Sequence, residues 1–194
     1  MIINRQRLQR TLAKKVPPVI SKKIFNELEQ EFEQAKEKML REFESHTVTK
    51  ELEGGQTSTN LSSTLGGEGN LYSFIGFAGE NALAELRELL VDGIKIVSKR
   101  VDKNKLIFTV RIAIPDGEKI AAATPMPWAP GISWAEGIEK GISGLGNFLN
   151  KTSSQSRSGK GIQIDFDVRG NQFSPTPYMT KILEDFVSAL TQIK

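Results

Sequence analysis

The pattern of apolar and polar positions is most regular between Ser21 and Glu44. Ser21 is a residue type that often caps the N-terminus of a helix. Charged residues of both signs fill the positions between the apolar ones, and several opposite charges lie three or four residues apart. The spacing predicts a long amphipathic helix with a solvated, glutamate-rich face. Its apolar stripe consists of Ile24, Leu28, Phe32, Ala35, Met39 and Phe43.

Three further segments have helical spacing. The last one follows Pro177 and predicts a C-terminal helix with Met179, Ile182, Leu183, Phe186, Leu190 and Ile193 on its apolar face. A shorter helix, with Asn81 as a cap and Asp92-Gly93 at its end, is predicted from Ala82, Leu83, Leu86, Leu89 and Leu90. The spacing of Ile138, Ile142, Leu145 and Leu149 indicates a helix over 134–149, although four glycines weaken it.

Alternating residues predict strands. Residues 94–101 and 106–114 flank a polar turn and should form an antiparallel hairpin. Residues 161–168 alternate most cleanly. The glycine-bracketed, aromatic stretch 69–77 predicts a strand that is buried on both sides or lies at an interface.

Some segments are less regular. Thr47–Leu52 is expected to be extended, and 61–65 is either a strand that pairs with 69–77 or a polar loop. Three prolines argue against regular structure over 118–135.

These elements predict an α+β fold, in which an antiparallel sheet is packed by a long N-terminal helix and a C-terminal helix. We expect residues 21–194 to form a single domain after a basic N-terminal arm over 1–20. Two polar, glycine- or serine-rich loops, at about 54–67 and 151–160, are expected to face partners.

The composition argues against an enzyme. The chain of 194 residues has a net charge of +3, no cysteine and a single histidine, His46, so no paired nucleophile and base is evident. Asp165 and Asp167 are interpreted as the solvent face of a strand. The Gly159-Lys160 pair lacks the spacing of a P-loop, and no cofactor or metal is expected. We also expect no membrane span and no signal peptide.

The charge distribution is uneven, because the first 23 residues hold seven basic residues and no acid. This basic arm is interpreted as a frayed terminus, as an element that packs on a neighbouring subunit, or as a DNA-phosphate contact. Leu8 and Leu12 offer apolar contacts for a protein surface. The residues that would face DNA are Arg5, Arg7, Arg10, Lys14 and Lys15.

Three segments of the chain resemble a protein family. Gly69, Leu71, Ser73 and Ile75 resemble the Thr-Gly-x-Leu-Arg-x-Ser-Ile segment of tail-completion, or neck, proteins of tailed bacteriophages, with Glu68 and Tyr72 in place of the Thr and the Arg. The stretch 134–141 is similar to an aromatic-x-x-x-Ile/Val-Glu-x-Gly segment of that family. Pro177-Tyr178-Met179 resembles its C-terminal Arg-Pro-Phe-Leu segment, without the Arg. The order of elements over about 21–190 is also similar.

The resemblance implies a structural virion protein that is assembled in the host cytoplasm. Identical subunits would form a ring, a hexamer or a dodecamer, between head and tail, in contact with neck, connector and tail-tube proteins and with DNA in the lumen. The two alternatives are a nucleic-acid-binding module that uses the basic N-terminus and a tail terminator protein. The candidate interface residues are Leu8, Leu12, Tyr72, Phe74, Trp128, Trp134, Arg157 and Lys160.

Overall fold

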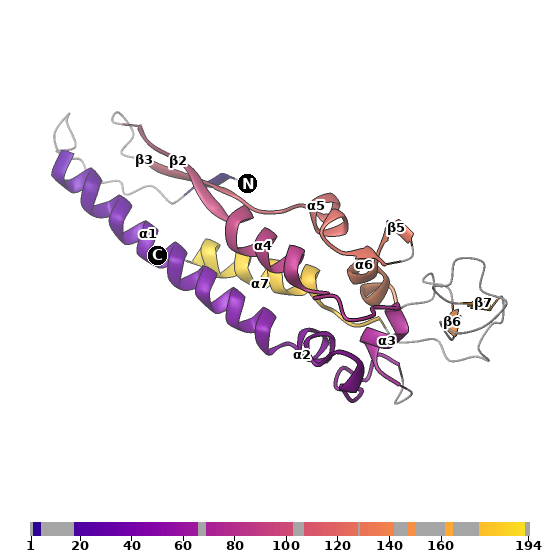
Figure 1. Cartoon of the computed structure of the whole chain (residues 1–194). Helices are drawn as coiled ribbons and strands as arrows, with labels where there is room; N and C mark the ends of the chain where they lie inside the picture. The colour runs from indigo at the N-terminus through magenta and orange to yellow at the C-terminus, as the bar shows by residue number, and fades with distance from the viewer. Residues whose placement is uncertain are drawn as a thin grey trace.

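The computed structural model describes residues 2–4, 18–65, 69–102, 107–127, 129–141, 147–149, 162–164 and 175–192. Its elements in chain order (Figure 1) are β1 (Ile2–Asn4), α1 (Pro18–Ser45), α2 (Thr47–Glu53), a 3-10 turn (Gly55–Thr57), α3 (Leu71–Ile75), α4 (Ala84–Gly93), β2 (Lys95–Asp102), β3 (Ile107–Ala113), α5 (Gly117–Ala122), β4 (Pro125–Met126), β5 (Ala129–Ser133), α6 (Trp134–Glu139), β6 (Asn147–Leu149), β7 (Ile162–Ile164) and α7 (Met179–Gln192). The fold is of the α+β class, as the sequence predicts.

The two predicted terminal helices are both present and lie side by side (Figure 1). Helix α1 has 28 residues and begins at Pro18, slightly before the predicted start, because proline suits the first turn of a helix. The rings of Phe32 in α1 and Phe186 in α7 meet edge to face, with centroids 6.3 Å apart. Both rings are almost completely buried. The apolar stripes read from the sequence therefore meet in the core.

The predicted hairpin is also confirmed, as β2 and β3 pair antiparallel and β1 adds a third strand in the order β1-β3-β2. Alternate residues of β3, namely Phe108, Val110 and Ile112, are buried. Phe108 meets Phe25 of α1 with ring centroids 5.5 Å apart. A register shift between Ile96 and Ser98 interrupts β2. The sheet thus packs one face on α1, and none of the described helices covers its other face.

The strand predicted over 69–77 is wrong, because Leu71–Ile75 form helix α3. The Asn70 side chain accepts a hydrogen bond from the Ser73 N–H and caps the helix start. Gly76 ends the helix at φ 94°, in the left-handed region that favours glycine. The Phe77 N–H then donates to the Tyr72 carbonyl at 3.1 Å. Local capping thus overrides the strand propensity of the aromatic residues.

Four other expectations need correction. Residues 47–53 form helix α2, whose start is capped by His46, instead of an extended segment. Residues 61–65 form a loop, which is one of the two predicted alternatives, but Leu65, at the end of the loop predicted to face partners, is buried in the core. The proline-rich stretch 118–135 contains most of α5 and the short strand pair β4–β5. Helix α5 ends before the first proline, Pro127 lies in the turn between the strands, and Pro125 and Pro130 lie in a two-stranded sheet, where both strands are edge strands that tolerate proline.

The predicted helix over 134–149 ends at Glu139, and residues 147–149 form strand β6 instead. Gly141 has a φ of 87°, which is incompatible with a continuing right-handed helix. Strand β6 pairs antiparallel with β7, which falls within the predicted strand over 161–168. Asp165, Asp167 and the loop at 151–160 lie outside the described residues.

Candidate assembly surfaces

An aromatic cluster joins α1, α3, α6 and the start of α7. The Trp134 ring lies 6.5 Å from the Phe77 ring and 6.3 Å from the Tyr178 ring, measured between centroids. Tyr72 extends the cluster through Phe77 at 5.3 Å, and Phe43 does so through Tyr178 at 6.2 Å. All five side chains are buried. Four segments that are far apart in the sequence therefore meet at one end of the subunit.

Hydrogen bonds of backbone and hydroxyl groups stabilise the same cluster. The Tyr72 hydroxyl donates to the Glu80 carbonyl at 2.8 Å and accepts from the Gly79 N–H at 2.7 Å. The Thr176 N–H donates to the Ile138 carbonyl at 3.2 Å, which ties the chain before α7 to α6. The cluster is thus a fixed scaffold that positions the surfaces around it.

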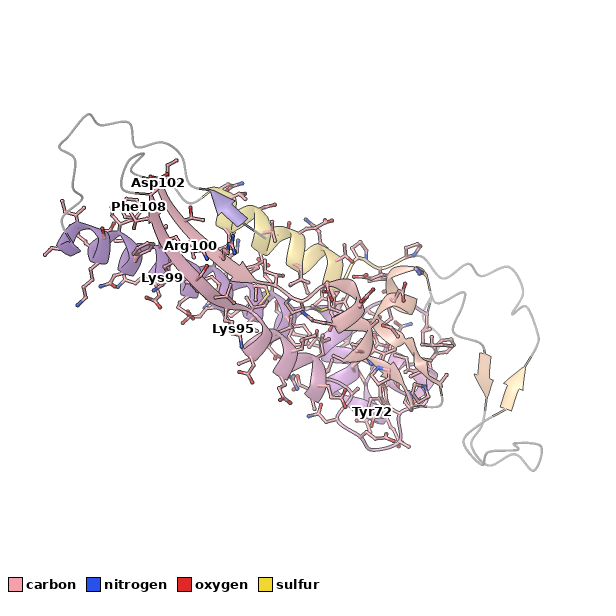
Figure 2. All side chains as sticks on the ribbon, turned by 90° about the horizontal axis from the view of Figure 1, so that it is seen from above. Tyr72, Lys95, Lys99, Arg100, Asp102 and Phe108 are labelled. Carbon is pink, nitrogen blue, oxygen red and sulfur yellow. The ribbon has the colours of Figure 1, made fainter. Side chains whose placement is uncertain are left out.

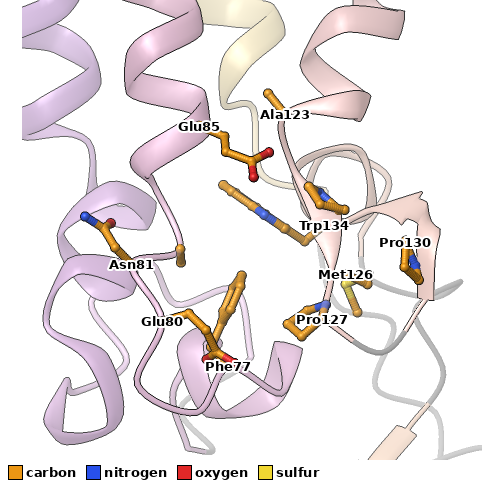
Figure 3. Close-up of a pocket in the computed structure, with 11 residues that line it drawn as sticks. Phe77, Glu80, Asn81, Glu85, Ala123, Met126, Pro127, Pro130 and Trp134 are labelled. Atoms are coloured by element: carbon orange, nitrogen blue, oxygen red, sulfur yellow. The ribbon is translucent and has the colours of Figure 1, made fainter.

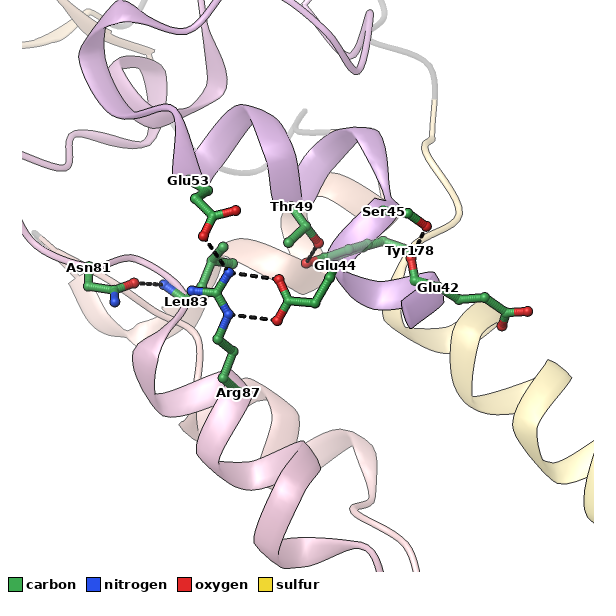
Figure 4. Close-up of polar contacts among 9 residues, drawn as sticks. All are labelled: Glu42, Glu44, Ser45, Thr49, Glu53, Asn81, Leu83, Arg87 and Tyr178. Carbon is green, nitrogen blue, oxygen red and sulfur yellow. Dashed lines mark hydrogen bonds and ion pairs between the residues drawn. The ribbon is translucent and has the colours of Figure 1, made fainter. Parts of the chain in front are cut away.

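A second network joins α1, α2 and α4 around Arg87 (Figure 4). The Arg87 guanidinium donates two hydrogen bonds to the Glu44 carboxylate and one to Glu53, each 2.8 Å long. The hydrogen bond to Glu44 is the main cause that raises the pKa of Arg87 above its ordinary value. The fork geometry of guanidinium and carboxylate fixes the orientation of α4 relative to α1.

Beneath this network, the Tyr178 and Thr49 hydroxyls form a buried hydrogen bond of 2.8 Å. Burial raises the pKa of Tyr178. The network and this bond together connect helices that are distant in sequence, so they are structural contacts of the subunit.

A pocket of about 310 Å³ opens beside the aromatic cluster (Figure 3). Phe77 and Trp134 of the cluster line it, together with Pro125, Pro127 and Pro130. The carboxylates of Glu80 and Glu85 are at its lining. Such a pocket suits an apolar side chain that carries or adjoins a positive charge.

The outer face of the sheet is basic (Figure 2). The antiparallel register places Arg100 opposite Thr109 and Ser98 opposite Arg111, so Arg100 and Arg111 are diagonal neighbours on one face. Lys95, opposite Ala113, is on the same face. All three are exposed. Sequence reasoning missed this face. Regular alternation over 94–101 would place Arg100 on the same side as Ile94 and Ile96, and the register shift between Ile96 and Ser98 moves it to the side of Arg111.

The interface residues predicted from the sequence differ in how far they are buried and in whether the structure describes them. Tyr72 and Trp134 are 4% and 1% exposed, so their side chains pack within the subunit and offer almost no surface to a partner. Phe74 is only partly buried against the core. The other candidates lie outside the described residues: Leu8, Leu12, Trp128, Arg157 and Lys160, together with Arg5, Arg7, Arg10, Lys14 and Lys15.

Within the described part of the chain, no group of three or more His, Asp or Glu side chains is arranged to hold a metal ion. His46 has a structural contact instead, because its Nδ1 accepts from the Val48 N–H at 3.3 Å. Burial lowers the pKa of His46, and a hydrogen bond with the Pro177 backbone opposes that shift.

In the same described ranges, none of the helices has the length and apolar character needed to cross a membrane.

Comparison with known proteins gives no relative: no family model, no curated protein and no solved structure matches this chain.

Proposed function

We propose that this protein is a structural virion subunit of a tailed bacteriophage. Identical copies form a ring in the neck or tail-completion region, where the ring joins head and tail and allows DNA to pass. The protein acts by assembly and has no catalytic role. It is made in the host cytoplasm and ends in the virion.

The observation that carries this proposal is the meeting of the three family-like segments in space. Residues 69–77, 134–141 and 177–179 resemble phage neck proteins separately in sequence, and they share one aromatic cluster through Phe77, Trp134 and Tyr178. Segments that define a common architecture are expected to pack on one another.

The surfaces of the subunit also support an assembly role. Strand β2 lies at the edge of its sheet, and the uncovered sheet face is charged. Val19 and Ile20, at the start of α1, are 77% and 49% exposed. Apolar side chains in such exposed positions are common in surfaces that become buried between subunits. A closed ring needs two different surfaces on each subunit.

Native mass spectrometry and particle imaging of the purified full chain, without DNA, test the proposal. We expect a discrete closed ring of six or twelve copies. Repeating the measurement after nuclease treatment controls for nucleic acid carried through purification. A chain that stays monomeric at high concentration, or that assembles only on added DNA, would contradict the proposed function.

A further inference from the structure

One face of helix α4 is acidic. Glu85, Glu88 and Asp92 recur three or four residues apart, so they share a face of the helix, and all three are exposed. Val91 is on the same side and is 48% exposed. Among the described residues, neither Glu88 nor Asp92 forms an ion pair. We call this set the acidic α4 face.

The outer face of the sheet has the opposite charge. Lys95, Arg100 and Arg111 are exposed and form no ion pair within the described ranges. Val97 lies at the register shift of β2 and is 56% exposed. We call these four residues the basic sheet face. Arg100 and Arg111 are diagonal neighbours of like charge, so one anionic partner can interact favourably with both.

Both faces are held in place by their own chain. The Lys36 ammonium donates to the Val91 and Ile94 carbonyls, which fixes the end of α4 where it enters β2. Lys99 pairs with Glu29 of α1 at 2.7 Å and anchors the edge strand. Surfaces that are already ordered lose little conformational entropy when they bind.

We propose that the basic sheet face of one copy of this chain docks on the acidic α4 face of a second copy. This inference rests on the proposed ring, since such a contact joins two different surfaces and is the kind that closes rings. The complementary charges come with an exposed valine on each face, so the two faces match in both charge and apolar character. The charges select and orient the partner, and the valines supply apolar area.

A protein partner fits this face better than a nucleic acid does. A phosphate-binding surface needs cations and gains nothing from an exposed valine. Binding of the face to DNA is therefore an outcome that the test must be able to detect.

The test uses two charge-reversed variants of the full chain. The sheet variant is Arg100→Glu/Arg111→Glu, and the helix variant is Glu88→Lys/Asp92→Lys. Each should raise the concentration at which half of the protein assembles by about tenfold or more, because like charges then face each other. The matched controls, Lys22→Glu/Lys50→Glu and Glu33→Lys/Glu184→Lys, make the same changes of net charge at exposed sites elsewhere and should assemble like the parent chain. Thermal melting of each variant verifies folding.

Mixing the two variants provides the decisive measurement. In a contact between the two variants, either an acidic sheet face meets a basic α4 face or a basic sheet face meets an acidic α4 face. An equimolar mixture should therefore recover assembly, and so should the variant that combines all four substitutions. If each variant forms normal rings by itself, the docking proposal is overturned and the proposed ring-forming function still holds. Recovery that stops at dimers would uphold the docking and contradict the ring. Assembly that is unchanged while the sheet variant loses binding to a short DNA duplex would assign the face to DNA and overturn the proposal.

Discussion

The Glu51 carboxylate accepts a hydrogen bond of 2.8 Å from the backbone N–H of Leu71, and the Glu51 side chain is fully buried. Its other oxygen accepts from the Ser62 N–H, also at 2.8 Å. One buried carboxylate in α2 thus holds both ends of the polar segment that leads into α3. A buried charge is tolerated there because backbone donors satisfy both of its oxygens.

We expect Glu51→Ala to destabilise the subunit by about 2–4 kcal/mol, because two backbone N–H groups lose their acceptor. Glu51→Gln keeps one acceptor oxygen and should cost less. Urea unfolding followed by circular dichroism measures both variants. Lys50→Ala, at an exposed position on the same helix, is the control and should change stability little. Equal stability of the Ala variant and the parent chain would contradict the role assigned to Glu51.

The end of α3 depends on Gly76, whose φ of 94° is unfavourable for any residue with a Cβ atom. Gly76→Ala should therefore cost about 1–2 kcal/mol in unfolding free energy. Gly117→Ala is a matched control, because Gly117 begins helix α5 and a Cβ atom there would meet open space. If the two substitutions had the same effect on the melting temperature, the strain argument would be wrong.

The long elements were predictable because periodicity is a cumulative signal. In α1 and α7 the apolar stripe repeats over several turns, and in β2–β3 the alternation repeats over a whole hairpin. Helix α3 was not predictable in that way, since five residues are too few for a period to emerge. Its signals were the flanking cap residues Asn70 and Gly76, which strand propensity outweighed in the sequence prediction.

The candidate surfaces were predictable only in part. Trp134 looked like an interface residue because aromatic residues are common at interfaces, but its burial depends on Phe77 and Tyr178, which come from distant segments. The burial of Glu51 likewise has no local signal, because its donors lie 11 and 20 residues further along the chain. Contacts of this kind depend on tertiary packing, which no local pattern encodes.

Phe32 and Phe186 connect the two terminal helices, so each substitution to alanine should destabilise the subunit by about 3–5 kcal/mol. Their edge-to-face contact adds a coupling of about 0.5–1.5 kcal/mol, so the double variant should lose less than the two single losses together. A double-mutant cycle in urea measures this coupling. Purely additive losses would show that the two rings contribute independently.

The hydrogen bond between Tyr178 and Thr49 predicts a different pattern. Tyr178→Phe or Thr49→Val alone leaves a buried hydroxyl without its partner and should cost about 1–3 kcal/mol. Together the two changes replace both partners with apolar groups of similar shape, and the second should then cost much less than it does alone. Thermal unfolding of the four proteins measures this. A double loss as large as the sum would contradict the pairing.

His46 should make stability fall with acidification. Burial lowers its pKa in the folded subunit below the value of about 6.5 that applies in the unfolded chain. The unfolded state therefore binds the proton more readily. The stabilising contribution is fully present above about pH 6.5 and is lost as the pH falls from there through the lower, folded-state pKa. Protonation also removes the lone pair with which Nδ1 accepts from the Val48 N–H.

His46→Asn tests this contribution, because asparagine can cap α2 through its side-chain oxygen and does not titrate. We expect the variant to lose less stability than the parent chain between pH 7.5 and about pH 5, as measured by urea unfolding at each pH. The carboxylates that titrate at lower pH are common to both proteins, so the difference between the two curves isolates the histidine. Parallel curves over this range would show that His46 does not couple protonation to folding.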